Sequence, residues 1–207
     1  MKKIIAVFAA CVLAILSLAA CSGGSKEPDN TSAKSGSQPS SSESISIKKS
    51  KALVVYFSAT GSTKKVGEYI RDETGADIFV IEPATPYGSA DLNWNDENSR
   101  VCKEHNDENR KVELKNTVVP NWSDYDTVYI GFPIWWGIAA WPTDTFVSAN
   151  DFTGKTVVPF CTSASSPLGD SAKELAAKAN GGNWFTGKRF SSIADKNEVS
   201  NWVKSIG

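Results

Sequence analysis

Residues 52–63 read Ala52-Leu53-Val54-Val55-Tyr56-Phe57-Ser58-Ala59-Thr60-Gly61-Ser62-Thr63. The apolar half of this stretch is a continuous run, which is typical of a strand buried on both faces of a parallel sheet. A helix is expected next, because Val66, Tyr69 and Ile70 share one helical face and Gly75 stands where a helix ends. The stretch therefore predicts a strand, a hydroxyl-rich loop and a helix in succession.

The alternation of strand and helix continues to the end of the chain. Further strands are expected at 77–81, 127–132, 156–161 and 183–185, and further helices at 170–180 and 195–203. Pro159 has no amide hydrogen, so a bulge is expected in its strand. The pattern predicts an α/β fold, a doubly wound parallel sheet with helices on both faces. The long connection 82–126, with one charged helix and much loop, is of a kind that usually serves function or has structure of its own.

Composition excludes several classes of protein. The chain has 207 residues, 41% of them hydrophobic, which is enough to form a core and excludes wholesale disorder. Lysine and arginine number 22 against 23 acids, a net charge of −1. A nucleic-acid partner is therefore not expected, since binding phosphate backbones needs a basic face.

The first 20 residues have the features of a secretion signal. Lys2 and Lys3 precede an uncharged run from 4 to 20, which is at the short end for a transmembrane anchor, the alternative interpretation. Leu18-Ala19-Ala20-Cys21 resembles the lipobox of bacterial lipoproteins. The resemblance implies cleavage before Cys21, acylation of Cys21, and an exported protein attached to the extracytoplasmic face of the cell membrane. Residues 21–50 are rich in serine and predict a flexible tether, which leaves 51–207 as the folded domain.

The cysteines and the histidine predict no metal site. Cys11 would leave with the signal and Cys21 would carry lipid, so only Cys102 and Cys161 stay in the folded part. We expect two unpaired thiols, although a disulfide is the alternative. Cys102 and His105, the only histidine, share a helical face, but two ligands do not make a metal site.

Three loops that follow predicted strands carry the candidate site. The first loop, 58–63, combines hydroxyls, a glycine and a helix N-terminus, a combination that fits an anion site and an ordinary helix-capping turn equally well. It lacks the lysine of a Walker A loop, which binds nucleoside triphosphates, and it lacks the G-x-G-x-x-G pattern of dinucleotide-binding Rossmann folds. The second loop contains Trp135 and Trp136, whose side chains should point in opposite directions, so one of them should be exposed or contact a ligand. The alternative is that both belong to the core, as we expect for Trp141.

The first two loops resemble those of the flavodoxin family, whose first loop reads [S/T]-x-T-G-x-T and which includes a subgroup with a Pro-Ile-Trp-Trp-Gly loop. Further matches, among them Tyr87, Glu104 and Trp202, extend the resemblance over 51–207. It implies five parallel strands in the order 2-1-3-4-5 and one non-covalently bound FMN. The residues that it implies as FMN contacts are Ser58, Ala59, Thr60, Gly61, Ser62 and Thr63 for the phosphate, Pro133, Ile134, Trp135, Trp136 and Gly137 beside the ring, and Thr162, Ser163, Ala164 and Ser165 at the ring edge. Relatives typically carry a glycine-rich third loop, whereas this chain has Ser163, Ala164 and Pro167, a departure that bears on redox tuning.

The function that the resemblance implies is electron transfer through FMN, with no catalytic side chain. The partner would be a redox protein or a small electron acceptor. One alternative is an FMN-dependent NAD(P)H:quinone-type reductase, and another is a non-enzymatic lipoprotein that kept the fold. The acids between 91 and 113 alternate with basic and amide residues, which is typical of a solvated helix; steering of a redox partner is the other interpretation.

Overall fold

The computed structural model describes residues 51–206. The predicted signal, Cys21 and the predicted tether lie outside the described residues. Within 51–206, the sheet has the order β2-β1-β3-β5-β6, and β7 also pairs with β5. All of these pairings are parallel. Because β5 and the β6–β7 edge correspond to the expected fourth and fifth strands, the predicted order 2-1-3-4-5 is confirmed.

The elements follow the predicted alternation, with several additions. The strands are β1 (Lys51–Tyr56), β2 (Asp77–Val80), β3 (Tyr125–Trp135), β4 (Ile138–Ala139), β5 (Thr156–Ser163), β6 (Asn183–Trp184) and β7 (Lys188–Ser191). The helices are α1 (Ser62–Thr74), α2 (Arg100–Asn106), the 3₁₀ turn η1 (Trp122–Asp124), α3 (Pro142–Ala149), α4 (Ser171–Lys178) and α5 (Lys196–Ile206). α3, β7, the η1 turn and the β3–β4 hairpin were not predicted from the sequence. None of the helices between 51 and 206 has the length and apolarity needed to cross a bilayer.

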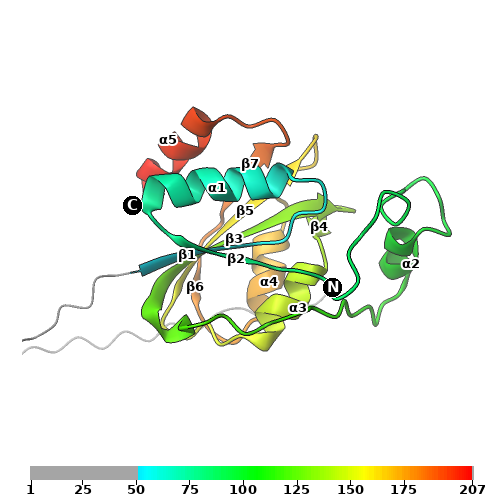
Figure 1. The fold of residues 1–207 in the computed structure, drawn as a ribbon, viewed down its shortest axis with the longest axis horizontal. Helices are drawn as coiled ribbons and strands as arrows, with labels where there is room; N and C mark the ends of the chain where they lie inside the picture. The colour runs from blue at the N-terminus through cyan, green and yellow to red at the C-terminus, as the bar shows by residue number, and fades with distance from the viewer. Residues whose placement is uncertain (1–50, 207) are drawn as a thin grey trace, which may run out of the picture. The chain divides into compact units, whose positions relative to one another are not determined.

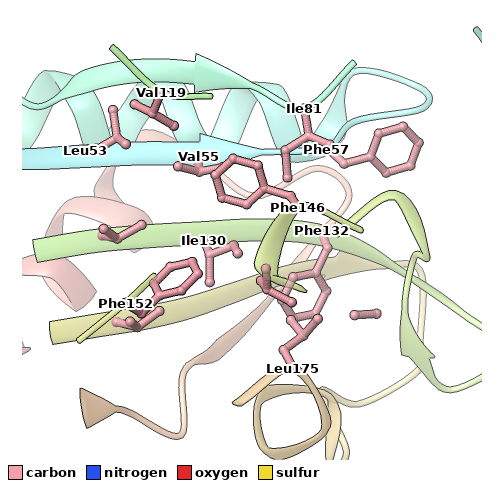
Figure 2. Close-up of a cluster of buried hydrophobic side chains, with 14 of the residues drawn as sticks. Leu53, Val55, Phe57, Ile81, Val119, Ile130, Phe132, Phe146, Phe152 and Leu175 are labelled. Atoms are coloured by element: carbon pink, nitrogen blue, oxygen red, sulfur yellow. The ribbon is translucent and has the colours of Figure 1, made fainter. Parts of the chain in front are cut away.

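Helices cover both faces of the sheet, and successive strand residues point to opposite faces. In Figure 1, α1 and α5 lie on one side of the strands, and α3 and α4 lie on the other. Leu53 and Val55 of β1 pack in the cluster that contains Phe146 of α3 and Leu175 of α4 (Figure 2). Val54, between them in the chain, packs in the cluster of α1 and α5. This two-sided burial explains why the central strands are apolar without interruption.

The bulge expected at Pro159 lies in the neighbouring strand instead. Pro159 pairs with Ile130 of β3 within an unbroken register from 156 to 162. On the other edge, the Val157 carbonyl accepts a hydrogen bond of 2.9 Å from the Phe185 amide. Pro159, two residues on, faces the same edge and has no hydrogen to donate. The edge strand accordingly breaks between β6 and β7, where Gly187, at φ 85°, packs against the Pro159 carbonyl.

Both remaining cysteines are buried and unpaired, as expected. Cys161 lies in β5, and burial raises the pKa of its thiol to about 12. A thiol with so high a pKa holds almost no thiolate at neutral pH, so it is a poor nucleophile. Cys161 is therefore part of the core and not of a reactive site.

Candidate functional site

The three loops of the candidate site meet at the carboxyl ends of the central strands. Tyr56 of β1 pairs with Gly131 of β3, and Pro133 of β3 pairs with Thr162 of β5, so the loops that follow start side by side. The chain continues from β1 to one neighbour, β2, and returns to place β3 on the other side of β1. Ligands of open α/β sheets bind at such a switch in strand order. The structure thus brings together the loops that the sequence singled out.

The first loop ends in a helix terminus that offers free donors. Gly61 precedes α1 with φ 95°, and its amide donates to the Ser58 hydroxyl at 3.1 Å. Among the described side chains, none caps α1, and its first turn contains no acid. The amides of the first turn therefore remain available, and the helix dipole favours an anion next to them. Thr60 and Gly61 are exposed, whereas Ser62 is partly buried.

Thr63 differs from the other hydroxyl residues of this loop. Its side chain is only 1% exposed. Its hydroxyl shares a 2.7 Å hydrogen bond with the hydroxyl of Thr162, the first predicted site residue of the third loop. This bond joins the first and third loops directly. Both residues thus lie where the site was predicted, and in this structure their hydroxyls contact each other.

The second loop is a tight turn with backbone strain. β3 and β4 form a hairpin in which Trp135 pairs with Ile138, leaving Trp136 and Gly137 as the two connecting residues. Trp136 has φ 47° and Gly137 has φ 83°. Two left-handed residues in succession make a type I′ turn, whose first position usually holds asparagine, aspartate or glycine. A tryptophan there is strained, and such strain concentrates at functional sites.

The two tryptophans of this loop have different environments, as their adjacency predicted. Trp135 is partly buried and packs edge-to-face against Phe57, Tyr87 and Trp141. Trp136 is 42% exposed and stacks on the ring of His105 in α2, with 4.4 Å between ring centroids. Trp141 is buried, as expected. Trp135 therefore belongs to the wall of the site, and Trp136 presents an accessible indole.

A cavity of about 640 Å³ lies between the second and third loops, a size typical of small-molecule sites. Its lining includes the predicted residues Ala59, Thr60, Pro133, Ile134, Trp135, Trp136, Ser163, Ala164 and Ser165. Leu92, Trp94, Val101 and Ser166 complete the lining and were not among the predicted site residues. Trp94 is 70% exposed, so the cavity has two accessible indoles. A tryptophan in a polar, charged segment was the signal that could have identified it, because tryptophan is enriched at binding interfaces.

A network around Glu104 joins α2 to Tyr87 and Trp141. The carboxylate accepts hydrogen bonds from the Tyr87 hydroxyl at 2.5 Å, from Trp141 Nε1 at 2.8 Å and from Arg100 Nε at 2.7 Å. Arg100 also lies over the Tyr87 ring, 4.0 Å from its centroid. Burial, followed by the hydrogen bond to Glu104, raises the pKa of Tyr87 far above its usual value. In Figure 1, α2 stands beyond the carboxyl end of the sheet, where this network fixes it.

A second hollow among the described residues does not form part of this site. A larger hollow, of about 830 Å³, lies between 108–117 and the α3–α4 helices, and its lining mixes acidic and basic side chains. No group of three or more histidine, cysteine or acidic side chains in 51–206 is placed to bind a metal ion. The cavity at the strand ends is thus the one that the predicted residues surround.

Solved structures similar to this chain are described as flavoproteins. One from Bacteroides uniformis is 39% identical, with a TM-score of 0.70 over 75% of this chain and 98% of that one. One from Bacteroides eggerthii is 40% identical, with a TM-score of 0.68 over 76% and 98%. A flavoprotein from Lactobacillus acidophilus, solved in complex with FMN, shares the fold at 24% identity and a TM-score of 0.52, over 74% and 99%.

Comparison with curated protein sequences finds no match. The family model described as flavodoxin, however, matches residues 51–206, the whole of the described structure. The matched residues include all strands of the sheet and all three loops of the site. On this ground the chain belongs to the flavodoxin family.

Proposed function

We propose that this protein binds one FMN non-covalently in the cavity at the carboxyl edge of the sheet and transfers electrons through it. The observation that carries the proposal is the joining of an anion-binding loop to a cavity with two accessible indoles. Family membership supports FMN as the ligand with both features. Redox chemistry is what FMN supplies when bound, so the residues described here bind, orient and shield it.

The residues fit both parts of FMN. The uncapped amides of α1 and the hydroxyls of Thr60 and Ser62 suit a phosphate, which needs several converging donors and tolerates no nearby acid. The indoles of Trp94 and Trp136 line the cavity and suit the flat face of a large aromatic ring. Trp136 would have to exchange its stack on His105 for one on the ring, or present its edge.

The lining of the cavity suits an electron carrier. Among the described residues that surround it there is no acid, histidine, lysine or cysteine. A side chain that could transfer a proton is therefore lacking, while electron transfer needs none. A nicotinamide or quinone could also enter so open a cavity, and steady oxidation of NAD(P)H by a quinone would identify the reductase alternative. A carrier should instead pass electrons to a redox protein or a small acceptor without such turnover.

Absorption spectroscopy of the purified protein, mixed with FMN and desalted, tests the proposal. We expect flavin bands at near one FMN per chain, with quenched fluorescence. A folded protein that stays colourless would refute the proposed function while leaving the fold intact.

Replacing Thr60 and Ser62 together with alanine should weaken FMN binding about tenfold to a hundredfold, because charge-assisted hydrogen bonds contribute about 1.5–3 kcal/mol each before water replaces part of them. Riboflavin, which lacks the phosphate, should bind both proteins equally. Thr63 is unsuitable for this test because its bond to Thr162 also joins two loops. Thr186→Ala, an exposed hydroxyl far from the loop in sequence, is the control. Equal loss of FMN and riboflavin would remove the assignment of the phosphate to this loop.

We also propose that the protein is exported and attached to the outer face of the membrane through lipid on Cys21. The support is the sequence around Cys21, and one lipidated residue with two acyl chains suffices for stable attachment. Cys21→Ser should abolish metabolic labelling with palmitate. Unchanged labelling would show that Cys21 is not the lipidated residue.

A further inference from the structure

An arginine from the edge strand holds the third loop of the site. Arg189 lies in β7, opposite Cys161 of β5. Its Nε donates to the Ser163 hydroxyl at 3.0 Å, and its Nη2 donates to the carbonyls of Ser163 at 3.0 Å and Ala164 at 2.8 Å. The Ser163 hydroxyl in turn donates to the Ser166 carbonyl. One guanidinium and one hydroxyl therefore fix the backbone from 163 to 166.

This clamp orients backbone amides as well as carbonyls. In a planar trans peptide the carbonyl and the following amide hydrogen point in opposite directions. Because the carbonyls of Ser163 and Ala164 point toward Arg189 on the β7 side, the amide hydrogens of Ala164 and Ser165 point away from β7. The opposite side of β5 is that of β3 and the second loop. Ala164 and Ser165 both line the cavity there, and among the hydrogen bonds of the described residues none uses their amides.

We propose that Arg189 is a positioning residue of the FMN site, which aims the amides of Ala164 and Ser165 at the polar edge of the ring. The inference rests on the proposed function. Ring nitrogens and carbonyl oxygens are acceptors that such amides would bind. The guanidinium fork, with donors in a fixed plane, holds the backbone of this loop in one orientation.

The charge of Arg189 gives the same residue a second effect. Among residues 51–206, no carboxylate forms an ion pair with Arg189. Its positive charge lies one hydrogen bond behind two residues of the cavity wall, where the dielectric constant is lower than in water. A positive charge near the ring favours the state with more electrons. Arg189 should therefore raise the reduction potential of the bound cofactor.

Three substitutions separate positioning from charge. Arg189→Ala removes both, Arg189→Lys keeps the charge but loses the fork, and Arg189→Gln keeps a donor but loses the charge. Arg71→Ala removes an exposed arginine that pairs with Asp72 on α1 and serves as the matched control. Each protein is compared for its FMN dissociation constant, for the reduction potential at saturating FMN, and for amide hydrogen exchange of 163–166 without FMN.

We expect the dissociation constant to rise about tenfold in Arg189→Ala and to stay raised in Arg189→Lys, because a lost charge-assisted hydrogen bond contributes about 1.5 kcal/mol or more. Hydrogen exchange of 163–166 should be faster in both. The potential should fall in Arg189→Ala and Arg189→Gln and be retained in Arg189→Lys. The control should match the unsubstituted protein throughout.

Two results overturn the inference. If the amide hydrogen exchange of 163–166 and the FMN affinity of Arg189→Ala equal those of the control, Arg189 does not position the loop. If Arg189→Gln leaves the potential unchanged, the charge has no effect on the cofactor. Failure of the proposed function is distinct, since the unsubstituted protein would then bind no FMN, while faster exchange in Arg189→Ala would still show the clamp.

Discussion

Replacing Glu104 with alanine should lower the free energy of unfolding by about 3 kcal/mol and release α2 from the rest of the protein. The substitution removes the acceptor of three hydrogen bonds and leaves the Tyr87 hydroxyl and Trp141 Nε1 without a partner. An unsatisfied buried donor costs about 1–3 kcal/mol. Because α2 contributes Val101 to the cavity wall, the release should also weaken FMN binding. Denaturant unfolding and FMN titration of the same variant measure the two effects.

Two further variants make this test specific. Glu104→Gln keeps an acceptor oxygen without the charge and should lose less stability than the alanine variant. Glu108→Ala removes an exposed acid just beyond α2 and should leave both unfolding and FMN binding near their original values. Amide exchange across Arg100–Asn106 should quicken only when Glu104 is changed. A Glu104→Ala protein as stable as Glu108→Ala would show that the network does not hold α2.

Replacing Gly131 with alanine should cost about 2–3 kcal/mol, because the site leaves no room for a methyl group. A Cβ at Gly131 would lie 2.1 Å from Cζ of Phe160, which is fully buried. Overpacking of a filled core typically costs about 1–3 kcal/mol, because side chains and backbone must shift. The clash comes from neighbouring strands at the centre of the sheet, since Gly131 pairs with Phe160. Chemical denaturation gives the free energy directly.

A double-mutant cycle with Phe160→Leu tests the cause. The leucine alone should destabilise by about 1–2 kcal/mol through lost volume, but together with Gly131→Ala it should cost clearly less than the sum. Gly88→Ala is the control, since a Cβ there meets only Asp91 at an ordinary 3.5 Å. Additive losses in the cycle would mean that Phe160 is not the obstacle.

The central strands were predicted because their burial is complete on both faces. β1, β3 and β5 appear as apolar runs because each is covered by helices from two sides. α3 was missed because it is short and begins directly at Pro142 after a buried tryptophan. β7 was missed because its Lys188 and Arg189 read as surface residues, and only the pairing with β5 shows where they lie.

The candidate site was predicted where a contiguous motif carries it and missed where distant segments meet. The loops 58–63 and 133–137 are continuous in sequence and lie at adjacent strand ends. Trp94 reaches the same cavity from the long connection through packing that no local pattern encodes. The Thr63–Thr162 bond joins residues 99 positions apart, and Arg189 holds a loop about 25 positions earlier in the chain. Such pairings depend on strand register, which a single sequence does not specify.

The break that Pro159 imposes on its neighbour also affects how the molecule behaves among copies of itself. An outer strand with a long row of unpaired backbone groups invites strands of other chains and leads to aggregation. Here that outer border is divided into two-residue β6 and four-residue β7, with a left-handed glycine between them. Neither segment offers a ladder long enough for a second chain to extend. A proline inside the sheet thus keeps this border from offering a long row of backbone groups to another chain.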